Sequence, residues 1–161
     1  MTTPTNKPKK IDVLKADCTQ LLDAQDVQKV LGVTISTAVT KIVGVANKDI
    51  GRTGLIRCRY GASSASVAAP VSVALSNYTS AALALAQIKK TAATIGGTQS
   101  QTSVSGYPAT VIVQAGGLLL MNYGTWTLSL AIADKLVPNT ELPAALTQLA
   151  NMVFLRVLKM G

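Results

Sequence analysis

A strict alternation of apolar and polar residues most limits how this chain can fold. The alternation is clearest at residues 126–133, where Trp, Leu, Leu and Ile alternate with Thr, Ser, Ala and Ala. A period of two residues places all the large apolar side chains on one face of a β-strand. The segment therefore predicts a half-buried strand whose apolar face must be covered by other elements.

Two apolar runs precede this strand. Residues 109–115 (ATVIVQA) and 118–123 (LLLMNY) are separated from each other by Gly116-Gly117, and the second run is separated from Trp126 by Gly124-Thr125. Glycine-containing pairs between apolar runs are typical of tight hairpin turns. We expect a three-stranded antiparallel meander over residues 109–133.

The first half of the chain carries the same alternation. Ile56, Cys58 and Tyr60 are predicted to face the core from one strand, with Arg57 and Arg59 on its other face. Residues 69–76 (APVSVALS) suit its hairpin partner, with Pro70 at a strand start or an edge. Residues 33–43 are β-branched and predict another strand, and residues 47–54 have the composition of an exposed loop.

Three helices are expected around these strands. Asp23 and Asp26 resemble a capping box, and Gly32 suits a helix end, so residues 24–31 predict a helix with Val27, Val30 and Leu31 inward. A central helix over 79–95 ends at Gly96-Gly97, with an inward stripe of Tyr78, Ala81, Leu85, Ile88, Ala92 and Ile95. A final helix is expected over 141–159.

These elements predict an α+β fold: a twisted antiparallel sheet with N-terminal, central and C-terminal helices packed on it. Residues 11–161 are enough for a single domain. Residues 1–10 (MTTPTNKPKK) have no apolar core and predict a flexible Pro/Thr/Lys tether. Such a tether often follows a lipid anchor or membrane span in an exported protein, although it also suits the end of a cytoplasmic one.

The composition argues against several functions. The chain has no His, and its carboxylates do not form pairs suited to acid–base catalysis or metal binding. We therefore expect no enzyme activity, cofactor or metal, although a Lys-activated Ser remains an alternative. The net charge of +8 arises partly because no Asp or Glu occurs from Ile50 to Ala133. Nucleic acid is not an expected partner, because the basic residues are not interleaved with aromatic ones.

Cys18 and Cys58 are the only cysteines. A catalytic thiolate normally needs a nearby base such as His, and two cysteines without His or an acidic cluster do not make an ordinary zinc site. The remaining alternatives are a disulfide and two buried thiols. We expect the disulfide, because a helix packed on the strand of Cys58 would bring Cys18 close to it, and a disulfide indicates an oxidising compartment.

Several short motifs resemble a known group of proteins. The segments are Cys18-Thr19-Gln20-Leu21-Leu22, the positions Val27, Leu31 and Gly32, then Cys58-Arg59-Tyr60 and Gly106-Tyr107-Pro108-Ala109. Together they resemble secreted actinobacterial, mycobacterial-type envelope lipoproteins of unknown function and the extracytoplasmic sensor domains of Ser/Thr kinases in that group. The chain contains no lipobox, and the second cysteine pair of the kinase sensors is missing. The resemblance implies an extracytoplasmic, disulfide-bonded α+β domain that binds a partner and catalyses nothing.

Two binding surfaces are expected. Arg57 and Arg59 form either a solvated strand face or a docking face for an envelope protein, an anionic lipid or an acidic polysaccharide. Tyr60, Tyr107 and Trp126 are candidates for contacts with a ligand, although such rings also pack in cores. The alternative function is a carrier that holds a lipid or another apolar small molecule in a cleft of the sheet.

Overall fold

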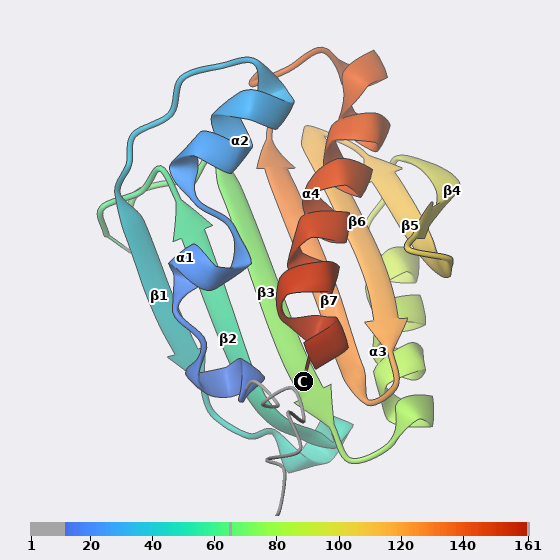
Figure 1. Ribbon diagram of the computed structural model, residues 1–161. Coiled ribbons are helices and arrows are strands. Elements are labelled where there is room, and N and C mark those ends of the chain that lie inside the picture. Colours follow the sequence, from blue (N-terminus) through green and yellow to red (C-terminus); the bar gives the residue numbers. More distant parts are fainter. Residues whose placement is uncertain (1–11, 65, 161) are drawn as a thin grey trace, which may run out of the picture.

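The computed structural model describes residues 12–64 and 66–160, and in this part of the chain one open sheet of seven strands forms the centre of the molecule (Figure 1). All neighbouring strands are antiparallel, in the order β1-β2-β3-β7-β6-β5-β4. The strands are β1 (Val39–Gly44), β2 (Arg52–Tyr60), β3 (Val71–Tyr78), β4 (Thr98–Val104), β5 (Tyr107–Val113), β6 (Gly116–Tyr123) and β7 (Trp126–Ala133).

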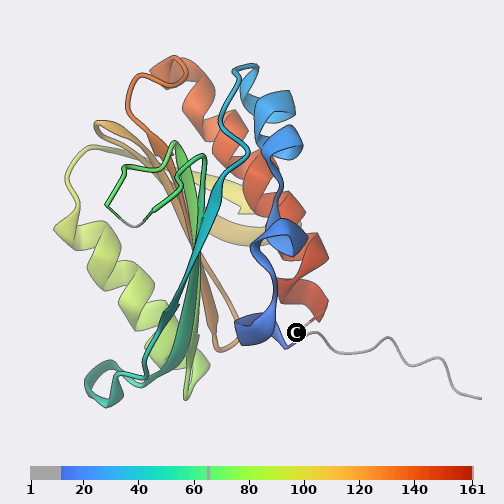
Figure 2. The same cartoon turned by 90° about the vertical axis from the view of Figure 1, so that its left-hand side faces the viewer.

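Helices cover both faces of this sheet, so the expected α+β class is confirmed. The short α1 (Cys18–Leu21), α2 (Ala24–Leu31) and the long α4 (Leu142–Arg156) lie on one face, and α3 (Ala81–Thr94) lies alone on the other (Figure 2). No helix in the described part of the chain is long and apolar enough to cross a bilayer. The tether predicted over residues 1–10 lies outside the described residues.

The two predicted halves of the sheet are joined by the pairing of β3 with β7. Val73 lies opposite Leu130 in this pair, and both side chains are fully buried. In β2, Ile56, Cys58 and Tyr60 are also fully buried, as their alternation with arginine predicted. The main core therefore lies between the sheet and the layer of α1, α2 and α4.

The prediction of a three-stranded meander was wrong by one strand. β4 precedes β5 and makes the meander four-stranded. Its sequence, TQSQTSV, has one large apolar residue, Val104, and that is its only buried position. Because most of its side chains remain in solvent at the sheet edge, the strand leaves no apolar alternation in the sequence.

Both ends of α2 follow the expected signals. At the start of α2, the Asp26 amide donates to the Asp23 carboxylate (2.8 Å), and the Asp23 amide donates to the Asp26 carboxylate (3.0 Å). Gly32 ends the helix with a left-handed φ of 71°. The last helix is shorter than the predicted 141–159, because α4 ends at Arg156 and a 3-10 turn follows. The strand predicted over residues 33–43 is also shorter than expected, because β1 comprises only residues 39–44.

The expected disulfide between Cys18 and Cys58 is present. It joins α1 to β2 across a sequence separation of 40 residues, with a Cα–Cα distance of 5.5 Å. Both cysteines are buried. The bond fixes the N-terminal segment over the same sheet face on which α4 packs.

Candidate functional site

Helix α3 packs on its face of the sheet but does not cover this face completely. The helix begins after Ser80, whose hydroxyl accepts a hydrogen bond from the Leu83 amide (3.2 Å). Only Ala84 among the residues of α3 is buried. Leu83 and Leu85 are 39% and 40% exposed. The helix therefore leaves part of the apolar surface of Leu83 and Leu85 in contact with solvent.

The stripe predicted to face inward from α3 is only partly covered. Tyr78 at its start is buried, but Ala81 and Leu85 are exposed, and Ile88, Ala92 and Ile95 are half-buried. The expectation of a buried stripe was therefore wrong for Ala81 and Leu85. For Leu85 the reason is that it lines an open groove beside the helix and does not pack onto the sheet.

This groove beside α3 has a volume of about 490 Å³. Leu85, Ile88 and Ala92 of α3 form one wall, and Leu120 of β6 and Pro108 of β5 contribute to the other. Lys89, Gln101 and Asn122 supply polar groups to the lining. We call this space the α3 groove. Its mixture of apolar walls and a few polar side chains is typical of a small-molecule site.

The strand pairing next to the α3 groove stops early. Strand β5 pairs with β6 only from Thr110 to Val113, although its pairing with β4 continues back to Tyr107. Pro108 lies two residues before Thr110, the last β5 residue that pairs with β6. Proline has no amide hydrogen to donate to a neighbouring strand. The sheet therefore opens between β5 and β6 where the groove lies.

Three aromatic rings meet on the α4 side of this opening. The ring of Tyr107 lies 5.0 Å from that of Tyr123 and 5.3 Å from that of Phe154, and the Tyr123 and Phe154 rings are 5.0 Å apart. Tyr107 is 40% exposed, and Trp126 is half-buried and pairs with Tyr123 in the hairpin of β6 and β7. Tyr107 and Trp126 thus lie on the sheet face opposite the α3 groove.

Tyr60 is a core residue in the structure. Its ring is fully buried, and its hydroxyl donates a hydrogen bond of 2.6 Å to the carbonyl oxygen of Cys18. Burial raises the pKa of the Tyr60 phenol far above its ordinary value. The side chain therefore offers no surface to a partner and holds α1 against β2.

The two candidate arginines differ in their surroundings. Arg59 donates a hydrogen bond of 2.7 Å to the Ser64 carbonyl and another to the Val67 carbonyl, so its guanidinium holds the segment that follows β2. Arg57 is exposed and makes no side-chain hydrogen bond or ion pair within residues 12–64 and 66–160. Of the two, only Arg57 presents an uncommitted positive charge.

The predicted binding residues do not form one site. Arg57 and Tyr60 occupy opposite faces of β2. In the sheet, β3, β7 and β6 separate β2 from β5, which carries Tyr107. Local sequence patterns did not predict most of the α3 groove. The apolar stripe of α3 and the proline in β5 are visible in the sequence, but only the folded sheet brings them together.

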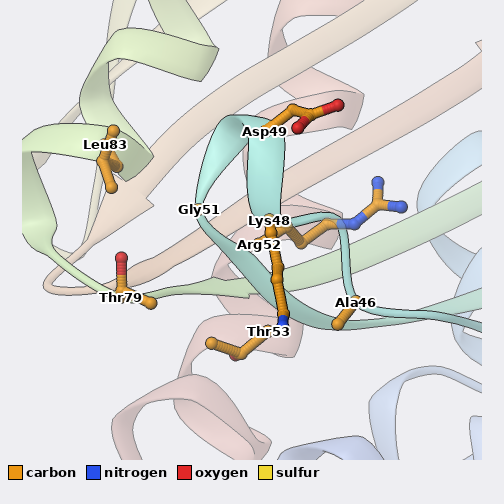
Figure 3. Close-up of a pocket in the computed structure, with 8 residues that line it drawn as sticks. All are labelled: Ala46, Lys48, Asp49, Gly51, Arg52, Thr53, Thr79 and Leu83. Carbon is orange, nitrogen blue, oxygen red and sulfur yellow. The ribbon is translucent and has the colours of Figure 1, made fainter.

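A second hollow lies at the tip of the β1–β2 hairpin, beside the start of α3 (Figure 3). Its volume is about 480 Å³, and Gly51, Thr79 and Leu83 line its inner side. In Figure 3 the Arg52 guanidinium points away from Leu83, and one of its outer nitrogens donates to the Val45 carbonyl (3.3 Å). Much of the remaining lining is the exposed turn of Ala46, Lys48 and Asp49, so this hollow is less enclosed by regular elements than the α3 groove.

No group of three or more His, Cys, Asp or Glu side chains comes together as a metal site within the described residues. A close ion pair joins Asp26 of α2 to Arg156 of α4, with nitrogen–oxygen distances of 2.5 Å and 3.2 Å. Hydrogen bonding to this guanidinium is the main cause that lowers the pKa of the Asp26 carboxyl. This pair ties two helices together at a distance from the groove.

Comparison with known proteins shows a shared fold. The crystal structure of the extracellular domain of PknH from Mycobacterium tuberculosis matches with a TM-score of 0.52 and 11% sequence identity, over 88% of this chain and 94% of that domain. No protein-family model matches the chain, and no curated protein is similar to it in sequence. At this identity the match establishes the architecture of the sheet and its helices.

Proposed function

We propose that this chain is a non-catalytic, extracytoplasmic binding domain, and that the α3 groove holds an apolar ligand such as a lipid chain. The observation that carries the proposal is that α3 covers its face of the sheet incompletely. A helix that buries only Ala84 leaves Leu85, Ile88 and Ala92 available to a ligand. Filling the groove would remove this apolar surface from water, which is the main source of affinity for such ligands.

The shape of the groove also supports an apolar ligand. Its volume of about 490 Å³ lies within the range of roughly 300–1,000 Å³ that is usual for small-molecule sites. The separation of β5 from β6 at Pro108 gives the groove an opening within the sheet. Since Lys89 and Gln101 are the polar groups on the α3 and β4 sides, a ligand with a polar or anionic end fits better than a pure hydrocarbon.

Two observations support an extracytoplasmic location. The disulfide between Cys18 and Cys58 is of the kind that persists in oxidising compartments. The fold is shared with a domain that is extracellular in its own protein. In this proposal the domain belongs to an envelope protein, either a lipoprotein or a sensor-like receptor, and ligand binding is its activity.

A pair of matched leucines tests the groove. Leu85 lines it, whereas Leu83 lies on the same helix, is equally exposed and lines only the hairpin hollow. We expect Leu85→Ser to weaken binding of a fluorescent long-chain fatty acid about fivefold, because roughly 1 kcal/mol of apolar contact is lost. Leu83→Ser should bind like the parent. Equal affinities of all three proteins, or no binding by the parent, would rule out the α3 groove as the site.

Arg57 supports a second candidate function, docking to an anionic envelope component. It projects from the same sheet face as α3 and has no acidic neighbour in sequence from Ile50 to Ala133. Binding to vesicles containing anionic phospholipid should fall in Arg57→Ser and should weaken as salt is added. Lys159→Ser removes the same charge from an exposed position on the opposite layer and is the control. Equal losses in the two variants would mean that only net charge matters.

A further inference from the structure

Strand β4 leaves one edge of the sheet open. It stands last in the strand order, and it lies at the outer right of the sheet in Figure 1. Within the part of the chain that the structure describes, no other strand pairs with its outer side. An unpaired edge presents a row of amide and carbonyl groups that can accept another strand.

The turn after β4 determines which groups face outward. Ser105 and Gly106 form a two-residue turn, both with positive φ (49° and 88°), and Val104 lies opposite Tyr107. In such a hairpin the residues flanking the turn form a hydrogen-bonded pair, and such pairs then alternate along the ladder. The backbone groups of Gln99, Gln101 and Ser103 therefore point away from β5, toward solvent.

This edge lacks the usual protections against pairing. Native edges are commonly blocked by charged residues, proline or a bulge. Residues 98–104 contain no charged residue and no proline, and they pair with β5 without a register shift. By contrast, the opposite edge strand β1 carries Lys41.

Side-chain hydrogen bonds connect β4 and the turn after it to the helices on both faces of the sheet. The Gln99 amide group donates to the Ala92 carbonyl of α3 (2.8 Å), and Thr102 is hydrogen-bonded to Thr147 of α4 (3.1 Å). The Ser105 hydroxyl also donates to the side-chain oxygen of Asn151. An edge ordered in advance loses less conformational entropy when a strand is added.

We propose that β4 is a docking edge for an extended segment of a partner protein that carries acidic residues at alternate positions. The elements around β4 favour this charge: α3, α4 and β5 contain no Asp or Glu, and Lys89 lines the same groove as Gln101 of β4. The net charge of +8 opposes a second copy of this chain as the occupant. Strand addition supplies affinity through backbone hydrogen bonds, and side chains on alternate positions supply specificity.

The two faces of β4 define the partner's pattern. Gln101 lines the α3 groove, so a partner residue opposite it lies on the same face as Lys89. Thr102 lies on the face of α4, where small, uncharged partner residues fit against Thr147. The expected sequence therefore alternates Asp or Glu with small polar residues such as Thr.

The test uses a capped heptapeptide in which Thr and Asp alternate, added to the whole chain at up to about 5 mM, which reveals even millimolar affinities. Amide hydrogen exchange of the protein is followed by NMR. We expect the amides of Gln99, Gln101 and Ser103 to become protected, while those of Ser100 and Thr102, which already bond to β5, stay unchanged. A peptide with Lys in place of Asp should bind about tenfold more weakly.

Two kinds of variant separate backbone pairing from charge. Ser103→Pro removes one outward donor and should weaken binding about threefold to tenfold, whereas Ser103→Ala keeps the donor and should bind like the parent. Lys89→Glu, which leaves β4 intact, should reverse the preference between the Asp and Lys peptides. Absence of protection, equal binding of both peptides by the parent, or protection that grows with protein concentration alone would each overturn the proposal. The last result would identify a second copy as the occupant.

Discussion

The hydroxyl of Tyr60 donates a 2.6 Å hydrogen bond to the carbonyl of Cys18, a residue whose own sulfur is bonded to Cys58 on the same strand as Tyr60. Strand β2 thus holds α1 by two separate links, one covalent and one a hydrogen bond. Both are buried. The N-terminal segment is therefore part of the main core, and its attachment can be tested at each link.

Removal of the Tyr60 hydroxyl should destabilise the fold. In Tyr60→Phe the ring still fills its site, but the buried Cys18 carbonyl keeps only the Leu22 amide as a donor (3.2 Å), at a cost of about 1 kcal/mol. Chemical unfolding measures the change. Tyr107→Phe, at a ring that is 40% exposed, should change the free energy of unfolding by less than about 0.5 kcal/mol. An unchanged stability of Tyr60→Phe would contradict the role of this bond.

The disulfide should contribute more than any single hydrogen bond. The bond closes a loop with a sequence separation of 40 residues, and the loop-entropy estimate for this length is about 4 kcal/mol. We expect the double variant Cys18→Ala/Cys58→Ala to unfold at a correspondingly lower denaturant concentration. Reductant should shift the parent in the same direction and leave the double variant unaffected. A parent protein whose intact mass shows two free thiols would refute the bond itself.

The Asp26–Arg156 pair predicts a loss of stability in acid. The guanidinium lowers the pKa of Asp26 in the folded state below its ordinary value of 3.8, so the unfolded chain takes up this proton first as the pH falls. The contribution of the pair is present above about pH 4 and is lost as the pH drops through the folded-state pKa. Because Arg156 is 40% exposed, we expect only about 0.5–1 kcal/mol.

The variant Asp26→Asn isolates this effect, since its side-chain oxygen can still accept the hydrogen bond from the Asp23 amide. Its stability should be lower than that of the parent at pH 7 and should approach it near pH 3. Urea unfolding at both pH values is the measurement. A constant difference between the two proteins across this range would show that the charge of Asp26 plays no part.

Arg59 should act on the segment between β2 and β3. Its guanidinium donates to the carbonyls of Ser64 and Val67, and the Val67 amide in turn donates to Ser64 (3.3 Å). In Arg59→Ala we expect faster hydrogen exchange at the Val67 amide. Arg57→Ala removes the same charge two residues away without touching this segment and should exchange like the parent. Equal exchange rates in the two variants would show that the Arg59 bonds do not order it.

Local sequence signals identified most elements because their cause is local. The side chains of Asp23 and Asp26 form their capping bonds within one helical turn, and Gly32 adopts its left-handed φ where the helix stops. Apolar and polar residues alternate in β2 and β7, and the apolar ones are those that become buried. The buried faces of these strands were therefore also predictable. Strand β4 escaped notice because its polar side chains remain in solvent at an edge.

The candidate site depends on relations that no local pattern contains. The apolar stripe of α3 looked like a buried face, since periodicity shows which residues share a side of a helix but not how tightly that side is covered. The early end of the β5–β6 pairing beside Pro108 and the position of Leu120 opposite α3 arise only when the meander folds. The difference between Arg57 and Arg59 likewise depends on tertiary structure. After β2 the chain turns back, so that the carbonyls of Ser64 and Val67 lie within hydrogen-bond distance of the Arg59 guanidinium.

By itself the sequence determined the α+β class and the core-facing sides of the alternating strands, because burial periods and capping bonds involve residues close together in the chain. It also favoured the disulfide over the alternatives, because the chain has no His to act as a catalytic base. Tertiary structure alone decided that the Tyr60 hydroxyl meets the Cys18 carbonyl and that α3 borders a groove. It also decided that, within residues 12–64 and 66–160, Arg57 has no side-chain partner and β4 has no strand on its outer side. Each of these depends on what lies opposite a side chain or a backbone group in space, and that is set by the packing of segments far apart in the chain.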